Sequence, residues 1–175
     1  SGPPVHLDGA RFGNGLVARG ATAAERTWRE GVGVGSFGGT KSGCLGVEAV
    51  VIFDPAKAWE FELRRKRGGH LFSKHRFLSA QMAAYLEDGL WLRLAAHANA
   101  MAARLATGLA SVPGATLRHP VQANILFPEW PAGLSARAEA AGAAFYPLPP
   151  PPGREAARPV PSRSPSEAAV HGFLA

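Results

Sequence analysis

A glycine-rich segment, residues 31–43, constrains this chain more than any other part of its sequence. It reads Gly-Val-Gly-Val-Gly-Ser-Phe-Gly-Gly-Thr-Lys-Ser-Gly and carries one lysine, Lys41. Small and apolar residues alternate over 32–37, which predicts a strand, and the segment 46–53 ends in an apolar run that predicts a second strand. We therefore expect Lys41 in a tight turn between two strands.

The segment contains the G-x-G-x-x-G pattern of dinucleotide-binding sites, from Gly33 to Gly38, and Asp54 follows at a suitable distance. In such a site a helix begins at the third glycine, and its N-terminus binds the pyrophosphate. Here Gly39-Thr-Lys-Ser-Gly follows, which is a poor start for a helix, and another strand comes next. The sequence therefore does not favour a dinucleotide site.

The same segment also has the length of a phosphate-binding P-loop, from Gly35 to Ser42, and it ends in Lys-Ser. Thr40, however, occupies the position of a glycine that lets the P-loop backbone wrap around the phosphates. No helix is predicted after Ser42, although a P-loop is followed by one. A P-loop-like nucleotide-binding domain is kept as an alternative function.

A third interpretation is a lysine that forms a covalent bond with an aldehyde. Such a lysine needs a close backbone and a pocket that is partly shielded from water. A short buried strand is predicted over 4–7, and by strand alternation His6, Asp8 and Ala10 share one side of it. A carboxylate such as Asp8 can keep a pyridinium nitrogen protonated. A strand-end aspartate about thirty residues before a glycine-flanked lysine resembles the aspartate-aminotransferase fold.

The rest of the chain is predicted to alternate helices and short strands, with a domain boundary near residue 90. Capping patterns predict a short helix from Thr22, a helix from Asp54-Pro55 to Gly68 and a last helix from about Ser164. Apolar residues at helical spacing predict a long helix over 90–109. The other predicted elements are a helix over 73–86, a strand over 124–127, a helix over 135–141 and a strand near 145–146, followed by a proline-rich loop over 147–152.

Composition excludes several classes of protein. The formal net charge is +6, but the cations are dispersed except at 64–67, where they complement the dipole at the end of a predicted helix. We therefore expect no nucleic-acid partner. A single cysteine, Cys44, excludes an internal disulfide framework and suits a reducing compartment such as the cytoplasm. No apolar run reaches the roughly 18 residues of a membrane span, so no membrane association is expected.

Five segments, in order along the chain, resemble low-specificity L-threonine aldolases. No single motif is specific, but the ordered set is. The segments are His6-Leu-Asp-Gly-Ala-Arg-Phe, Ser36-Phe-Gly-Gly-Thr-Lys-Ser-Gly, Arg64-Arg-Lys-Arg-Gly-Gly-His, Arg76-Phe-Leu-Ser-Ala-Gln and Ala123-Asn-Ile-Leu-Phe. The chain looks like the C-terminal half of such an enzyme.

This resemblance implies an α/β fold of the aspartate-aminotransferase type. Residues 1–89 would be the end of the large sheet domain that binds pyridoxal 5'-phosphate (PLP), and 90–175 a small C-terminal α+β domain, with the N-terminal part of the fold absent. The family cleaves L-threonine or L-allo-threonine to glycine and acetaldehyde. The complete protein would be a homo-oligomer, either dimer or tetramer, that acts on a small β-hydroxy amino acid and needs no metal.

The resemblance also assigns roles to individual residues. Lys41 would be the Schiff-base lysine, Asp8 the partner of the pyridinium nitrogen, and Ala10 a residue packed against the ring. Arg11 and Arg158 would bind the substrate carboxylate. In the same comparison, Arg76 would reach a phosphate of the cofactor across a subunit interface.

The chain departs from the family pattern in two places. In the family, a long stretch before the first motif holds the loop that binds the PLP phosphate, and this chain starts a few residues before that motif. Pro159 and Pro161 each remove a ladder donor after Arg158, where the family has a regular strand, and an edge strand could tolerate them. We therefore expect the chain alone to be inactive, and a non-catalytic fragment that serves as an interaction module is a further alternative.

Overall fold

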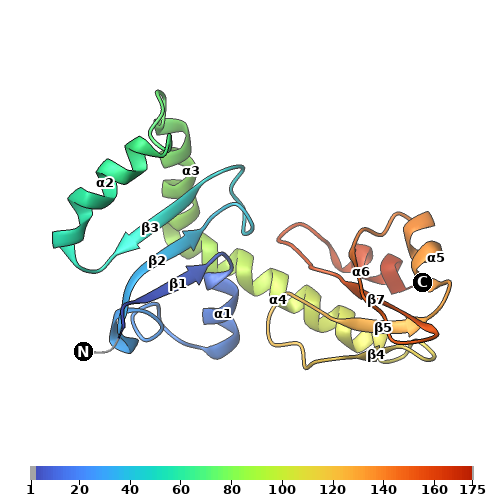
Figure 1. Cartoon of the computed structure of the whole chain (residues 1–175). Coiled ribbons are helices and arrows are strands. Elements are labelled where there is room, and N and C mark those ends of the chain that lie inside the picture. The colour runs from blue at the N-terminus through green and yellow to red at the C-terminus, as the bar shows by residue number, and fades with distance from the viewer. Residues whose placement is uncertain (1–2, 175) are drawn as a thin grey trace. The chain divides into compact units, whose positions relative to one another are not determined.

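The computed structural model describes residues 3–174, and the chain divides into two compact units, Ser1–Leu94 and Ala95–Ala175. Each unit has its own sheet, and the boundary between them falls within the long helix α4, Leu90–Leu109 (Figure 1). The two units are described separately below.

A three-stranded sheet forms the centre of the first unit. Its order is β1 (Val5–Gly9), β2 (Val32–Gly38) and β3 (Glu48–Ile52), with β1 parallel and β3 antiparallel to β2. The predicted strands are confirmed within two residues at each end. The prediction that the first strand is buried is wrong, because β1 forms an edge of the sheet and Val5 is 45% exposed.

The helix α1 (Phe12–Arg19) was not predicted from the sequence. It contains two glycines in its first turn, which lower helix propensity, so its stability comes from packing, with Gly13, Asn14 and Leu16 buried. The α-helix predicted from Thr22 is also wrong. Thr22 and Glu25 form the expected reciprocal capping contacts, but turns and a single 3₁₀ turn, Trp28–Glu30, follow them.

Asp54 starts the next helical segment as its spacing predicts. The side chain of Asp54 accepts a hydrogen bond from the Ala56 N–H at 3.1 Å, and a 3₁₀ turn, Pro55–Lys57, leads into α2 (Ala58–Arg67). The last turn of α2 carries the basic run. The helix α3, Arg76–Leu86, follows and begins three residues later than expected.

Aromatic rings cover one face of the first sheet. The ring of Phe37 on β2 lies between rings from three helices, with centroid distances of 6.4 Å to Phe12, 5.9 Å to Tyr85 and 5.3 Å to Trp91. The helices α1 and α3 and the first turn of α4 therefore pack on this face, and Figure 1 shows α1 close to β1.

The second unit contains a four-stranded antiparallel sheet in the order β4-β5-β7-β6. Its strands are β4 (Thr116–Leu117), β5 (Pro128–Pro131), β6 (Tyr146–Leu148) and β7 (Arg154–Arg158). The strand predicted over 124–127 is wrong, because only single backbone bonds hold that segment, from the Arg118 N–H to the Phe127 carbonyl and from the Leu126 N–H to the Pro159 carbonyl. The ladder begins at Pro128.

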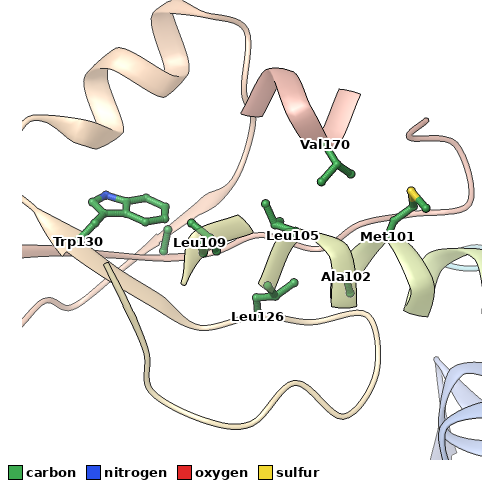
Figure 2. Packing of buried hydrophobic residues seen from close by; sticks show 8 residues of the cluster. Met101, Ala102, Leu105, Leu109, Leu126, Trp130 and Val170 are labelled. Carbon is green, nitrogen blue, oxygen red and sulfur yellow. The ribbon is translucent and has the colours of Figure 1, made fainter. Parts of the chain in front are cut away.

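Residues of α4 fill the core of the second unit, as their helical spacing predicts. Figure 2 shows side chains of Met101, Leu105 and Leu109 on α4 close to Leu126, Trp130 and Val170, all of them buried. Val170 comes from the last helix, α6 (Glu167–Leu174), which the Ser166 hydroxyl caps through the Ala169 N–H at 3.2 Å. The short helix α5, Leu134–Ala140, matches its prediction within one residue.

Candidate active site at the edge of the first sheet

The carboxyl ends of β1 and β2 lie at the same edge of the first sheet because the two strands are parallel. Asp8 is opposite Ser36, and Gly9 is opposite Phe37. The hydroxyl of Ser36 bridges the strands, since it accepts the Gly9 N–H and donates to the Leu7 carbonyl, both at 3.4 Å. Asp8 and the turn that carries Lys41 therefore leave the sheet at one edge.

Two glycines allow these strand ends to approach each other closely. A Cβ on Gly9 would lie 2.1 Å from the Ser36 carbonyl oxygen, and a Cβ on Gly38 would lie 2.5 Å from the Ala10 carbonyl oxygen. Atoms cannot approach that closely, so both positions require glycine. Gly38 thus brings Ala10 against the end of β2, a few residues before Lys41.

Lys41 lies in the turn that connects β2 to β3. The Gly39 carbonyl accepts the N–H groups of Ser42 and Cys44, both at 3.0 Å, and the Thr40 hydroxyl donates to the Val47 carbonyl at 3.3 Å. The side chain of Lys41 is exposed, whereas Ser42 beside it is buried. Backbone hydrogen bonds therefore fix the turn. The sequence predicted that Lys41 is partly shielded from water, but in this structure its side chain is exposed.

Two residues of α3 that were not singled out from the sequence, Gln81 and Tyr85, form hydrogen bonds with the turn. The side-chain oxygen of Gln81 on α3 accepts the N–H groups of Leu45 at 2.9 Å and of Gly46 at 3.4 Å. Burial raises the pKa of Tyr85, and a hydrogen bond with Ser42 opposes that shift. Gln81 ends one of the family-like motifs, which was the only signal in the sequence that could have pointed to it.

The carboxylate of Asp8 is exposed at the strand end. One of its oxygens accepts the Ala10 N–H at 3.1 Å, a contact that fixes the turn after β1. Ala10 is half-buried and lies in the turn after β1, outside the strand whose alternation was expected to place it beside Asp8. The two side chains expected to contact a cofactor ring are therefore neighbours at this edge.

The three arginines singled out from the sequence lie in different settings. Arg11 precedes α1, directly after Ala10, and its carbonyl accepts the Gly15 N–H at 3.3 Å. Arg76 is the first residue of α3, is exposed, and has its guanidinium 4.9 Å from the centroid of the Phe77 ring. Arg158 belongs to the second unit, where it ends β7.

The prolines after Arg158 do not disturb its strand. β7 ends at Arg158, before Pro159, so neither Pro159 nor Pro161 occupies a ladder position. β7 is an inner strand, between β5 and β6, and not the edge strand that the prolines suggested. The guanidinium of Arg158 lies 4.7 Å from the centroid of the Tyr146 ring on β6, and its buried Nε has no hydrogen-bond partner among the residues described here.

Comparison with known proteins decides the family. A family model described as Beta-eliminating lyase matches residues 1–130. The chain belongs to this family. It is 49% identical over 123 residues to a low specificity L-threonine aldolase of Pseudomonas sp. (strain NCIMB 10558), and 46% identical over 123 residues to the one of Pseudomonas aeruginosa. Each match covers 70% of this chain but only 36% of the relative's length.

Solved structures confirm the expected fold. The threonine aldolase of Leishmania major superposes on 97% of this chain with a TM-score of 0.87 at 28% identity, and the match covers 49% of that chain. A structure from Exiguobacterium sp. 255-15 matches with a TM-score of 0.73 at 20% identity, which shows the fold alone. The α/β fold predicted from the resemblance is thus confirmed, and the chain spans about half of the Leishmania protein.

The fold does not support the nucleotide-binding alternatives. A dinucleotide site or a P-loop would need a helix after Gly38 or Ser42, whereas a turn and the antiparallel strand β3 follow. No cluster of three or more histidine, cysteine, aspartate or glutamate side chains within residues 3–174 could hold a metal ion. Over the same residues, no helix is both long and apolar enough to cross a membrane.

Proposed function

We propose that this chain is part of a PLP-dependent aldolase that cleaves L-threonine or L-allo-threonine to glycine and acetaldehyde. The observation that carries the proposal is the register of β1 and β2, which brings Asp8 and the Lys41 turn to one edge of the sheet. Relatives named low specificity L-threonine aldolase, at 46–49% identity, support the substrate class.

The side chains at this edge fit PLP chemically. The cofactor has an aldehyde, a ring nitrogen and a flat face, and the edge offers a primary amine, a carboxylate and a methyl group, on Lys41, Asp8 and Ala10 respectively. Only one oxygen of Asp8 takes part in the bond to the Ala10 N–H, so the other can contact the ring nitrogen. The close approach that Gly38 permits keeps the Ala10 methyl group next to the turn.

Each of these residues then has a distinct task in the reaction. When bound, PLP withdraws electrons from the bonds at the substrate Cα. Lys41 would hold the cofactor through its side-chain amine at the aldehyde. Asp8 holds the proton on the ring nitrogen, because a carboxylate at that atom favours the charged ring.

We assign binding of the substrate carboxylate to Arg11 and Arg158. A guanidinium group can bind a carboxylate through two parallel hydrogen bonds, which fixes the orientation of the carboxylate and so that of the Cα–Cβ bond. The Tyr146 ring lies against the Arg158 guanidinium, and the Nε of Arg158 is buried without a hydrogen-bond partner among residues 3–174. We refer to Arg158 with Tyr146 as the arginine–tyrosine pair.

The proposal extends to the assembly and the surroundings of the enzyme. We propose that residues 1–89 complete the large PLP-binding domain and that 90–175 form the small domain. The complete enzyme is a homo-oligomer in which Arg76 contacts a cofactor phosphate of a second subunit. It works in the cytoplasm without nucleic acid or membrane, which agrees with its single free cysteine.

Trapping with borohydride tests the central assignment. The catalytically active protein is incubated with PLP and reduced with sodium borohydride, and the modified peptide is found by mass spectrometry. We expect the label on Lys41 and none on Lys74 or Lys66. The Lys41→Ala variant should lose both the label and threonine cleavage. A label on another lysine, or turnover by the variant near the wild-type rate, would contradict the assignment.

A further inference from the structure

The segments that flank β5 and β7 stay paired beyond the ladder itself. Continued at the register of the ladder, Leu126 comes opposite Pro159, and the Leu126 N–H donates to the Pro159 carbonyl at 3.1 Å. Asn124 comes opposite Pro161, and its side-chain Nδ2 donates to the Pro161 carbonyl at 2.9 Å. We refer to these two bonds as the proline clasp. They hold the chain directly after Arg158, the last residue of β7.

The prolines explain why a side chain takes part in the clasp. Opposed residues of an antiparallel pair can exchange two backbone hydrogen bonds, but proline has no N–H to donate. Pro159 and Pro161 can therefore only accept, and the chain after Arg158 is held by fewer backbone bonds than a regular strand. Asn124 adds a donor from its side chain. Asn124 and both prolines are buried within the second unit, so the added bond is shielded from water.

The side chain of Asn124 acts on the second unit through its donor. Only 3% of the residue is exposed, and its Oδ1 has no hydrogen-bond partner among residues 3–174. The bond from Nδ2 to the Pro161 carbonyl is therefore the means by which this side chain fixes the backbone, three residues after Arg158. An apolar side chain of similar size, such as leucine, would fill the same space without that bond.

We propose that Asn124 is a positioning residue, which fixes the chain after β7 and so holds the Arg158 guanidinium in place for the substrate carboxylate. The ladder holds Arg158 from its N-terminal side, and the proline clasp holds it from the other side. On the neighbouring strand Tyr146 lies directly opposite Arg158, with its ring centroid 4.7 Å from the guanidinium. A binding side chain is held precisely only where such supporting contacts fix it. The inference rests on the proposed role of Arg158.

Substrate kinetics test the effect of the donor. In the catalytically active enzyme, Asn124→Leu should raise KM for L-threonine about threefold to tenfold, because a misplaced guanidinium binds the carboxylate less well. The kcat and the affinity for PLP should change by less than about twofold. Gln122→Leu is the matched control, since Gln122 is an exposed amide two residues earlier in the same segment. A KM that is the same in both variants overturns the inference.

A double-variant cycle separates positioning from general stabilisation. If Asn124 acts through Arg158, Asn124→Leu should change KM by less than about twofold in an Arg158→Ala background. The same factor in both backgrounds overturns the inference, because a residue that only stabilises the unit acts independently of Arg158. Asn124→Ala, which removes the donor without adding a branched side chain, repeats the cycle. Loss of folding in both variants, measured by urea unfolding, also overturns it, since the bond then supports the whole unit.

Hydrogen exchange gives a readout that does not depend on activity. In the protein without PLP, mass spectrometry follows exchange of the backbone amides in peptides that cover 158–164. These amides should exchange at least about fivefold faster in Asn124→Leu than in the wild type, because the clasp no longer closes the segment. Peptides that cover α5, Leu134–Ala140, should keep the wild-type rate. Unchanged exchange over 158–164 overturns the inference.

These results separate the inference from the proposed function. If the wild type does not cleave threonine, or if Arg158→Ala leaves KM unchanged, the assignment of Arg158 fails and the inference fails with it. If Arg158→Ala raises KM and Asn124→Leu does not, the inference alone fails. Labelling of Lys41 by borohydride tests the aldolase assignment independently, because the proline clasp lies in the second unit and Lys41 in the first.

Discussion

The glycines near the catalytic edge are fixed by backbone packing. Cβ atoms on Gly9, Gly38 and Gly39 would lie 2.1, 2.5 and 2.6 Å from carbonyl oxygens of neighbouring segments, and none of the three has a positive φ. The sequence suggests that glycines here bring the backbone close to a ligand. In the structure they bring strand ends and the Lys41 turn close to one another, which positions the side chains of Asp8 and Lys41.

Gly38→Ala should therefore destabilise the first unit. The added methyl group meets the Ala10 backbone, which cannot move aside as a flexible side chain would, so a loss of about 1–3 kcal/mol in the free energy of unfolding is expected. Gly33→Ala in the same strand is the matched control, because the nearest atom lies 3.8 Å away. Urea unfolding measures both variants. A Gly38→Ala protein as stable as Gly33→Ala would contradict the packing argument.

The arginine–tyrosine pair gives a prediction for substrate binding. Tyr146→Leu removes the ring under the Arg158 guanidinium, and a cation–π contact at a partly exposed site contributes about 0.5–1 kcal/mol or more. We expect kcat/KM for threonine to fall about threefold to tenfold, mainly through a higher KM, while PLP binding is unchanged.

Tyr146→Phe keeps the ring and should behave like the wild type. Arg158→Ala should lower kcat/KM for threonine by an amount that corresponds to about 2–5 kcal/mol. Steady-state kinetics of the active enzyme check all three variants. A normal KM in Tyr146→Leu, combined with a large loss in Arg158→Ala, would show that the arginine acts without the ring.

At the scale of elements, local sequence signals predicted helices correctly where local interactions determine the structure. The cap at Asp54 and the apolar spacing of 90–109 are such signals, and α2 and α4 form where expected. The helix α1 was missed because burial of Leu16 and its neighbours, not propensity, holds its glycine-containing turn. β5 was misplaced because its ladder depends on β7, which lies more than twenty residues further along the chain.

The cap of α5 is another long-range feature. Its N-terminus has a glycine, Gly133, instead of a capping side chain. Glu155 on β7 replaces it, accepting the N–H groups of Gly133 at 2.9 Å and Ser135 at 2.8 Å, and the Trp130 indole N–H at 3.2 Å. These bonds, the one from Gly133 first, lower the pKa of Glu155 to about 2.

Stability of the second unit should therefore fall in acid. A carboxyl group with a lowered pKa stabilises the fold above its ordinary value of 4.5, and that stabilisation is lost as the pH falls toward about 2. Glu155→Gln should be less stable than wild type at pH 6 and should lose less stability on acidification. Urea midpoints from pH 6 to pH 2.5 measure this. Glu139→Gln, on the exposed side of α5, should keep the wild-type dependence.

At the scale of the whole molecule, the sequence was most informative about the catalytic edge. The sequence placed Asp8 at the end of a strand and Lys41 in a glycine-rich turn after another, and the structure shows that these two strands are parallel neighbours. The supporting contacts from Gln81 and Tyr146 could not be predicted, because they join segments 35 and 12 residues apart through side chains with no distinctive local pattern. Their positions follow only from the packing of α3 and from the β6–β7 register.

The edges of the first sheet determine how this chain behaves in solution. In this sheet β2 is central and the edges are β1 and β3. Val5 on β1 and Val50 and Val51 on β3 are 41–45% exposed, and an apolar edge strand is a template for pairing with another chain. Aggregation of the chain through β3 is therefore expected.

A charge on β3 should suppress this aggregation. Val50→Lys places a solvated cation on the exposed edge, where it opposes strand pairing, and a surface change of this kind alters stability by only about 0.5 kcal/mol. We expect light scattering at about 50 μM protein to rise at least severalfold more slowly than for the wild type. Val50→Ala, which removes apolar surface without adding charge, should lie between the two. If Val50→Lys scatters as fast as Val50→Ala, apolar surface and not the open edge drives the aggregation.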